Sequence, residues 1–156
     1  MTPDELLRAA YEDMVTAACT DIRANRHVPS CMVAIVTSPW NPPELHVMEI
    51  LDPRQAPHMM RAAVKTNAAI FGFVFLTVGT TLHEQPGGLS VPHDALLCLW
   101  CTAHAAGGDS FRIVRDWVRG VQLGDPEPLP DMLQRIYRAV FNPAMPLPPM
   151  LTPTPH

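Results

Sequence analysis

The middle of the chain holds three long runs of hydrophobic residues, at 70–82, 95–104 and 111–117. Each run is rich in β-branched and aromatic residues, which favour strands. Turn-forming residues separate the runs, with Pro86-Gly87-Gly88 in the first connection and Gly107-Gly108-Asp109 in the second. This pattern predicts a three-stranded antiparallel meander with turns at 83–93 and 105–110.

Two shorter segments ahead of the meander predict a β-hairpin. Residues 31–37 are apolar nearly throughout, as in a strand covered on both faces, and 38–43 form a proline-rich turn. In the return strand, at 45–51, side chains alternate between the two faces of the sheet. One face carries Leu45, Val47 and Glu49, and the other carries His46, Met48 and Ile50.

Three segments have helical periodicity. Apolar residues recur at three- and four-residue spacing over 6–22, after Thr2 and Glu5, which form a capping box. Asp52 provides a similar cap ahead of a second helix, and Pro130 opens a third with its own apolar stripe. The predicted order of elements is therefore α-β-β-α-β-β-β-α.

This order predicts an α+β fold in one domain, over residues 1–141. We expect about five mostly antiparallel strands, a hairpin plus the meander, with helices packed on one face. The length of 156 residues suits a single domain. Residues 142–156 are too rich in proline for a helix or an inner strand, so we expect an extended or disordered tail.

Composition narrows the classes of partner. The net charge is −4 and no basic stripe is present, so we expect no nucleic-acid partner. Charged residues make up only 17% of the chain, which favours a surface partly covered by a protein partner or a second copy. No basic leader precedes an apolar run, and the apolar stretch at 68–82 is short for a membrane span. We therefore expect a cytoplasmic protein without membrane contact, whose four cysteines are free thiols.

Cys98, Cys101 and His104 have a spacing that occurs in zinc and redox sites. Zinc needs ligands that converge on one point, but on a regular strand Cys98 and His104 share a face and Cys101 points away. A redox pair normally lies at a helix N-terminus, and this one lies in a β-run. The pattern favours buried cysteines that pack as small hydrophobic residues, with a metal site as the alternative.

His83, Glu84, His93 and Asp94 flank the connection between the first two meander strands. Direct pairing of those strands would bring the two dipeptides close together. Two imidazoles and two carboxylates can bind a metal or perform acid–base catalysis, although ordinary loop polarity explains them as well. These four residues are the candidate catalytic group.

Exposed aromatic and basic residues are the candidates for binding a partner. The set comprises Trp40, Arg112, Arg115, Trp117 and Arg119. Acidic residues are interspersed among the arginines, as on a solvated mixed-charge face.

Three strand motifs resemble those of a family of small α+β proteins encoded by bacteria and their phages. The matching segments are AIFGFVFLT at 69–77, DALLCL at 94–99 and FRIVRD at 111–116. The resemblance covers roughly residues 1–130. It implies the fold and no activity, because the family is an uncharacterised one, a domain of unknown function.

Three functions are consistent with these observations. The first is a non-enzymatic protein-interaction or assembly module that self-associates through a sheet edge or face. The second is a small metal-binding protein or metal-dependent hydrolase that uses the histidine and acidic residues named above. The third is a small-molecule sensor with a pocket between helix and sheet. No nucleotide-binding or serine-esterase motif occurs, so we expect no cofactor and lean away from an enzyme.

Overall fold

The structure is a computed structural model that describes residues 1–84 and 90–148, with only the backbone described at 81–84 and 90–92. The elements are α1 (Pro3–Arg23), β1 (Cys31–Val36), β2 (Glu44–Met48), the 3-10 turn η1 (Pro53–Gln55), α2 (Ala56–Thr66), β3 (Ile70–Glu84), β4 (Ser90–Thr102), β5 (Ala106–Asp116), β6 (Gly120–Leu123), β7 (Glu127–Pro128), α3 (Asp131–Arg138) and the 3-10 turn η2 (Ala139–Phe141). The predicted tail lies partly outside these residues, so its character stays a prediction.

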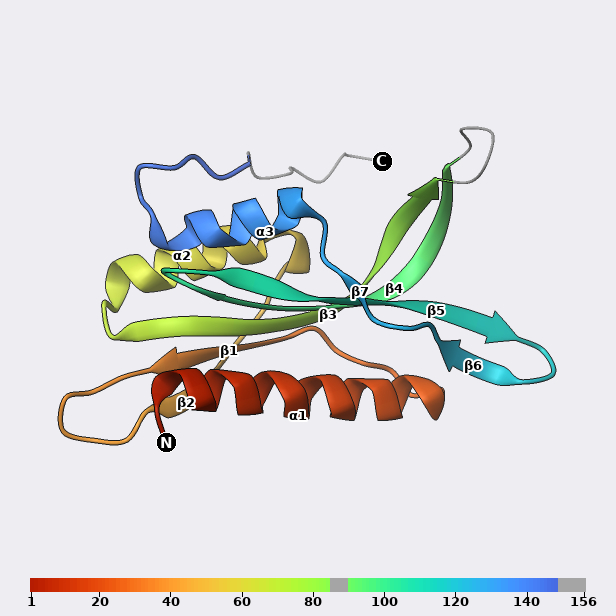
Figure 1. Ribbon diagram of the computed structural model, residues 1–156, viewed down its shortest axis with the longest axis horizontal. Helices are drawn as coiled ribbons and strands as arrows, with labels where there is room; N and C mark the ends of the chain where they lie inside the picture. The colour runs from red at the N-terminus through yellow and green to blue at the C-terminus, as the bar shows by residue number, and fades with distance from the viewer. Residues whose placement is uncertain (85–89, 149–156) are drawn as a thin grey trace.

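In the described part of the chain, seven strands form one antiparallel sheet. The strand order is β2-β1-β3-β4-β5-β6, and β7 pairs with β5. The long hairpin of β3 and β4 forms the centre of this curled sheet (Figure 1). The predicted α+β class and single antiparallel sheet are confirmed, but the sheet has more strands than expected. The extra strands, β6 and β7, lie between the last predicted strand and the third predicted helix.

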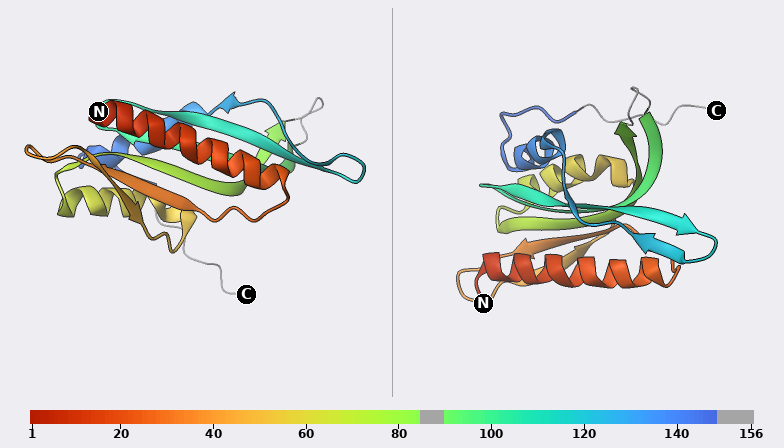
Figure 2. Two further views of the ribbon diagram at one scale, coloured as in Figure 1. Left: turned by 90° about the horizontal axis from the view of Figure 1, so that it is seen from below. Right: turned by 45° about the vertical axis from the view of Figure 1, so that its right-hand side comes forward.

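Helices cover both faces of the sheet, so the prediction of helices on one face is wrong (Figure 1, Figure 2). α1 lies along one face, and α2 and α3 lie on the other. β3 explains the difference, because its consecutive side chains from Phe73 to Leu76 are all apolar. Phe73 and Phe75 pack with α2 and α3, whereas Val74 and Leu76 pack with α1. A strand that is apolar on both sides buries its surface only when both sides are covered.

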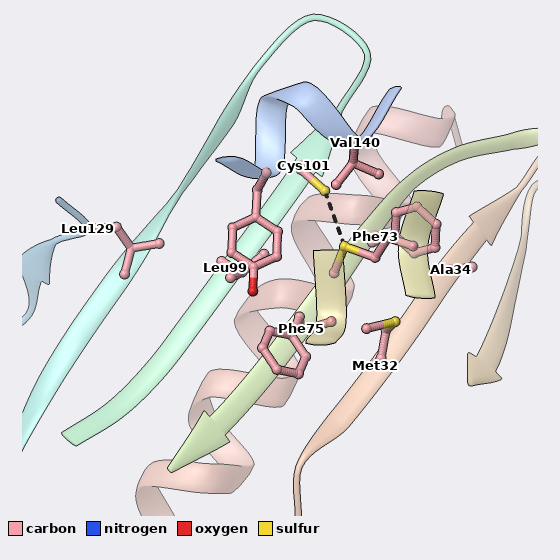
Figure 3. Packing of buried hydrophobic residues seen from close by; sticks show 11 residues of the cluster. Met32, Ala34, Phe73, Phe75, Leu99, Cys101, Leu129 and Val140 are labelled. Atoms are coloured by element: carbon pink, nitrogen blue, oxygen red, sulfur yellow. Dashed lines mark hydrogen bonds between the residues drawn. The ribbon is translucent and has the colours of Figure 1, made fainter. Parts of the chain in front are cut away.

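The core beneath α2 and α3 is rich in aromatic rings and sulfur (Figure 3). Phe73 lies 5.8 Å from Phe141 between ring centroids. The thiol of Cys101 contacts the thioether sulfur of Met60 at 3.9 Å, which joins β4 to α2. Flexible, polarizable sulfur side chains suit this irregular space between helix and sheet.

The predicted turn at 105–110 is wrong, because Gly107 and Gly108 lie inside β5. The turn lies between β4 and β5, where the Thr102 hydroxyl accepts hydrogen bonds from the backbone N–H groups of His104 and Ala105, both at 3.2 Å. Glycine is needed within β5 because a Cβ on Gly107 would come within 2.9 Å of the Trp100 ring. Glycine inside a strand often marks such a close approach.

The first meander turn is shorter than the predicted 83–93, since β3 reaches Glu84 and β4 begins at Ser90. The predicted cap of the first helix is confirmed, whereas Asp52 caps η1 and not α2, whose N-cap Gln55 makes no side-chain hydrogen bond. Thr2 and Glu5 form the capping box of α1, and the Asp52 carboxylate accepts a hydrogen bond from the N–H of Arg54 at 3.0 Å. Among the described residues, no helix is long and apolar enough to cross a membrane.

Candidate functional site

The five candidate binding residues lie at two ends of the molecule. Trp40, in the loop between β1 and β2, is 91% exposed, and Trp117, in the turn between β5 and β6, is fully exposed. The two loops lie at opposite ends of the sheet in Figure 1 and again in the left view of Figure 2. Trp40 therefore cannot share one contact surface with Trp117.

The three arginines of that set lie at the Trp117 end of the sheet. Nη2 of Arg112 lies 2.8 Å from Nε2 and 3.1 Å from Nδ1 of the His93 ring, which links β5 to β4. Arg115 donates from Nη1 to the side-chain oxygen of Asn25 at 3.3 Å, just after α1. Arg119 lies in the exposed turn before β6. Two of the three arginines thus make contacts within the protein.

The four candidate catalytic residues lie on β3 and β4, which pair directly as expected. The register pairs His83 with Val91 and His93 with Thr81, so His83 lies two residues nearer the hairpin turn than His93 does. The side chains of His83 and Glu84 lie outside the described residues, so a catalytic role for the four stays a prediction. Among described side chains, no group of three or more His, Cys, Asp and Glu residues is placed to hold a metal ion.

Cys98 and Cys101 point to opposite faces of β4. Cys98 packs in the cluster beneath α1, and Cys101 packs in the cluster beneath α2 and α3. His104 is exposed in the following turn. Burial raises the pKa of each thiol to about 12, whereas a reactive cysteine needs a lowered pKa. In this arrangement the two thiols cannot ligate one metal ion. Both thiols stay protonated at neutral pH.

The edge of the sheet at β2 is open in the described part of the chain. β2 pairs with β1 on one side and has no strand on the other. Leu45 and Val47 lie on the same face of β2, with 47% and 78% of their area exposed. Trp40 lies before β2 and Leu51 after it, and both are largely exposed. An apolar strip therefore runs along a free strand edge.

A groove of about 800 Å³ lies between the sheet and helices α2 and α3, and we call it the α2–α3 groove. Phe75, Leu97 and Leu99 of the sheet line it. Leu133, Ile136 and Tyr137 of α3 line it as well. β3 and α3 are separated in the sequence by most of the meander. The groove therefore forms only when the helices pack on the sheet.

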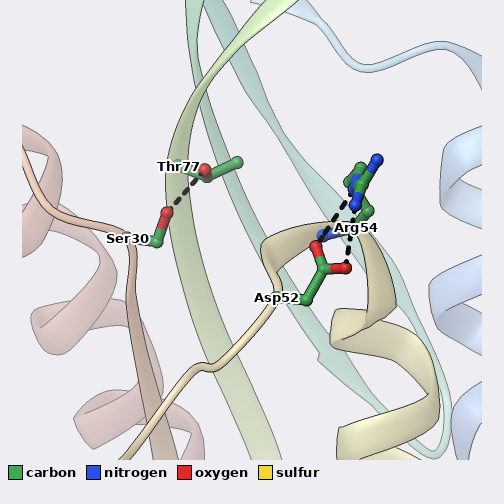
Figure 4. Close-up of polar contacts among 4 residues, drawn as sticks. All are labelled: Ser30, Asp52, Arg54 and Thr77. Atoms are coloured by element: carbon green, nitrogen blue, oxygen red, sulfur yellow. Dashed lines mark hydrogen bonds and ion pairs between the residues drawn. The ribbon is translucent and has the colours of Figure 1, made fainter. Parts of the chain in front are cut away.

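Polar side chains at the rim of the groove are paired with one another (Figure 4). Ser30 and Thr77 share a hydrogen bond of 2.8 Å between their hydroxyls. Two guanidinium nitrogens of Arg54 contact the carboxylate of Asp52, each at 3.1 Å. The hydrogen bonds from Arg54 lower the pKa of Asp52. The rim therefore carries charges that balance.

Two features of this site were missed in the sequence. The alternation of the return strand showed that Leu45 and Val47 share a face. It did not show that this face is left uncovered by the helices. Tyr137 belonged to an apolar helical stripe, and its hydroxyl was the signal that this stripe contacts more than a dry core.

Comparison of the chain with protein-family models, with curated proteins and with solved structures finds no match. The strand edge and the groove are therefore interpreted from their own chemistry.

Proposed function

We propose that the chain is a non-enzymatic assembly module that joins a second copy of itself through the free edge of β2. The observation that carries the proposal is the exposure of Val47, 78%, beside an unpaired strand edge. A free edge presents unpaired backbone N–H and C=O groups, which a further strand can satisfy. An apolar side chain on that edge adds buried area when the strand pairs.

A second copy suits this edge because the edge is self-complementary. Antiparallel pairing of β2 with itself is compatible with a two-fold axis, the commonest symmetry of homo-oligomers. With the axis at His46, Leu45 of each copy lies opposite Val47 of the other. The same register brings the Trp40 end of one copy to the Leu51 end of the other. The apolar residues at the centre of the strip, Leu45 and Val47, then meet apolar residues of the other copy.

The charge of β2 also permits self-pairing. The ring nitrogen Nε2 of His46 contacts the Glu44 carboxylate at 3.1 Å, so this carboxylate has a partner within its own strand. Natural proteins protect free edges with lysine, and β2 has none. The β2 edge therefore lacks the lysine that would disfavour pairing with a second copy.

The experiment measures mass in solution by light scattering over a wide concentration range. We expect the wild-type chain to reach a multiple of 17.2 kDa and the Val47→Lys variant to remain a monomer. Val118→Lys is the matched control, because Val118 is an equally exposed valine in the turn between β5 and β6. A wild-type chain that stays monomeric at high concentration contradicts the proposal, as does equal dissociation in both variants.

A further inference from the structure

Tyr137 lines the α2–α3 groove, and no hydrogen bond joins its hydroxyl to another group in the described part of the chain. Tyr137 is only 8% exposed. Its ring stacks on Phe75 with centroids 6.4 Å apart. Buried phenol hydroxyls normally form a hydrogen bond, because an unpaired one costs free energy. This hydroxyl is therefore available to donate a hydrogen bond to a molecule bound in the groove.

The protonation state of this hydroxyl makes it a donor. Burial raises the pKa of Tyr137 above its ordinary value, so the proton stays in place at neutral pH. A molecule bound beside Tyr137 should therefore carry an oxygen that accepts a hydrogen bond.

Charge around the groove argues against an ionic guest. The Arg54 guanidinium is neutralised by Asp52, and the His58 ring already contacts the carbonyl oxygen of Pro148 at 2.6 Å. The remaining walls are mainly aliphatic and aromatic. An ion placed there would lose its hydration without gaining an opposite charge.

We propose that the α2–α3 groove binds an uncharged, apolar small molecule with a carbonyl or ether oxygen that accepts a hydrogen bond from Tyr137. The volume of about 800 Å³ lies within the range of ligand pockets, roughly 300–1,000 Å³. This site is separate from the β2 edge and does not depend on self-association.

Nile red is a suitable probe, since it is uncharged, apolar and fluorescent, and carries a carbonyl oxygen whose hydrogen bonding shifts its emission. The experiment titrates Nile red into the full chain and records intensity and emission wavelength. We expect saturable binding at one site. Tyr137→Phe keeps the stacked ring and removes the hydroxyl, so it should weaken binding about fivefold and move the emission to shorter wavelength.

A matched pair of tryptophan variants locates the bound dye. Leu133→Trp fills the groove from α3, whereas Met132→Trp places the same side chain on the exposed side of that helix. We expect Leu133→Trp to abolish saturable binding and Met132→Trp to leave it unchanged. Thermal unfolding of each variant confirms that it is folded.

Four results would overturn the proposal. Equal binding by Leu133→Trp and wild type would place the dye elsewhere. Unchanged binding by Tyr137→Phe would remove the hydroxyl from the site. Equally tight, Tyr137-dependent binding of anilinonaphthalene sulfonate would show that the site accepts an anion. Binding only after Met150→Asp and Leu151→Asp in the full chain would show that its own tail occupies the groove.

Discussion

The hydroxyl of Tyr11 donates a hydrogen bond to Oδ2 of Asp109 at 2.7 Å and joins α1 to β5 across 98 residues of sequence. The contact is partly buried, and it fixes the long helix against β5. A hydrogen bond to a carboxylate in such a place stabilises a fold more than a neutral one. We therefore expect Tyr11→Phe to lower the free energy of unfolding by about 1 to 2 kcal/mol, measured by urea denaturation at neutral pH.

A double-mutant cycle with Asp109→Ala separates this bond from general packing. If the bond accounts for the loss, Tyr11→Phe costs little when Asp109 is already alanine. Additive losses would show that the phenol contributes only through its contacts with neighbouring side chains.

Alkaline pH should destabilise the protein through its buried thiols. Burial raises the pKa of Cys101 to about 12, whereas an unfolded thiol has a pKa near 8.5. Above pH of roughly 9 the unfolded chain releases this proton and the folded chain keeps it, so unfolding becomes easier as pH rises. The contribution is fully present below that pH and is lost as pH approaches the folded pKa.

The measurement is the slope of unfolding free energy against pH, in wild type and in Cys101→Ala. We expect the variant to lose about 1.4 kcal/mol less per pH unit over this interval. Met60→Ala, which removes its sulfur partner without removing a titrating group, serves as the control and should keep the wild-type slope. Identical slopes in all three proteins would contradict the assignment.

Local signals explain which parts of this fold could be predicted. Capping by Thr2 and alternation along β2 depend on residues adjacent in sequence, and both were recognisable. Helix positions relative to the sheet depend on which faces are apolar, and Val74 beside Phe73 already showed that β3 needed cover on both sides. The strand β7, with two residues, is too short to leave a sequence signal.

The candidate site was harder to predict because it depends on contacts distant in sequence. Tyr137 lines a groove only because α3 returns to lie over β3 and β4. Val47 is exposed because α1 covers β1 and β3 but leaves the edge strand open. Neither condition can be read from periodicity, which shows that a face is apolar without showing what covers it.

The glycines of β5 were predicted to form a turn, but they lie inside the strand, where a larger residue would clash. This leads to a further prediction. A Cβ on Gly108 would lie 2.1 Å from the carbonyl oxygen of Cys98, and its φ is +152°. Gly108→Ala should therefore lower the free energy of unfolding by more than about 2 kcal/mol. Gly79→Ala is the control, since its Cβ would meet only Leu97 at 3.8 Å and alanine reduces the entropy of the unfolded chain. Equal effects in urea denaturation would contradict this interpretation.

The guanidinium of Arg61 holds the end of the last helical segment against α2. It donates to the carbonyl of Ala139, to that of Val140 at 3.5 Å and to that of Asn142 at 3.0 Å. These carbonyls lie after the end of α3, in η2 and just beyond it, where a positive charge is favourable. Because α3 continues directly into η2, this contact also positions the α3 wall of the groove.

Arg61→Met should lower the free energy of unfolding by about 1 to 3 kcal/mol, since it removes charged hydrogen bonds but keeps the aliphatic stem. Arg61→Lys should recover only part of this loss, because an ammonium group cannot reach three carbonyls as the planar guanidinium does. Lys65→Met, on an exposed position of α2, removes the same charge as a control and should change stability by less than about 0.5 kcal/mol. If Arg61→Lys were as stable as wild type in urea denaturation, the charge alone would suffice and the fork geometry would have no role.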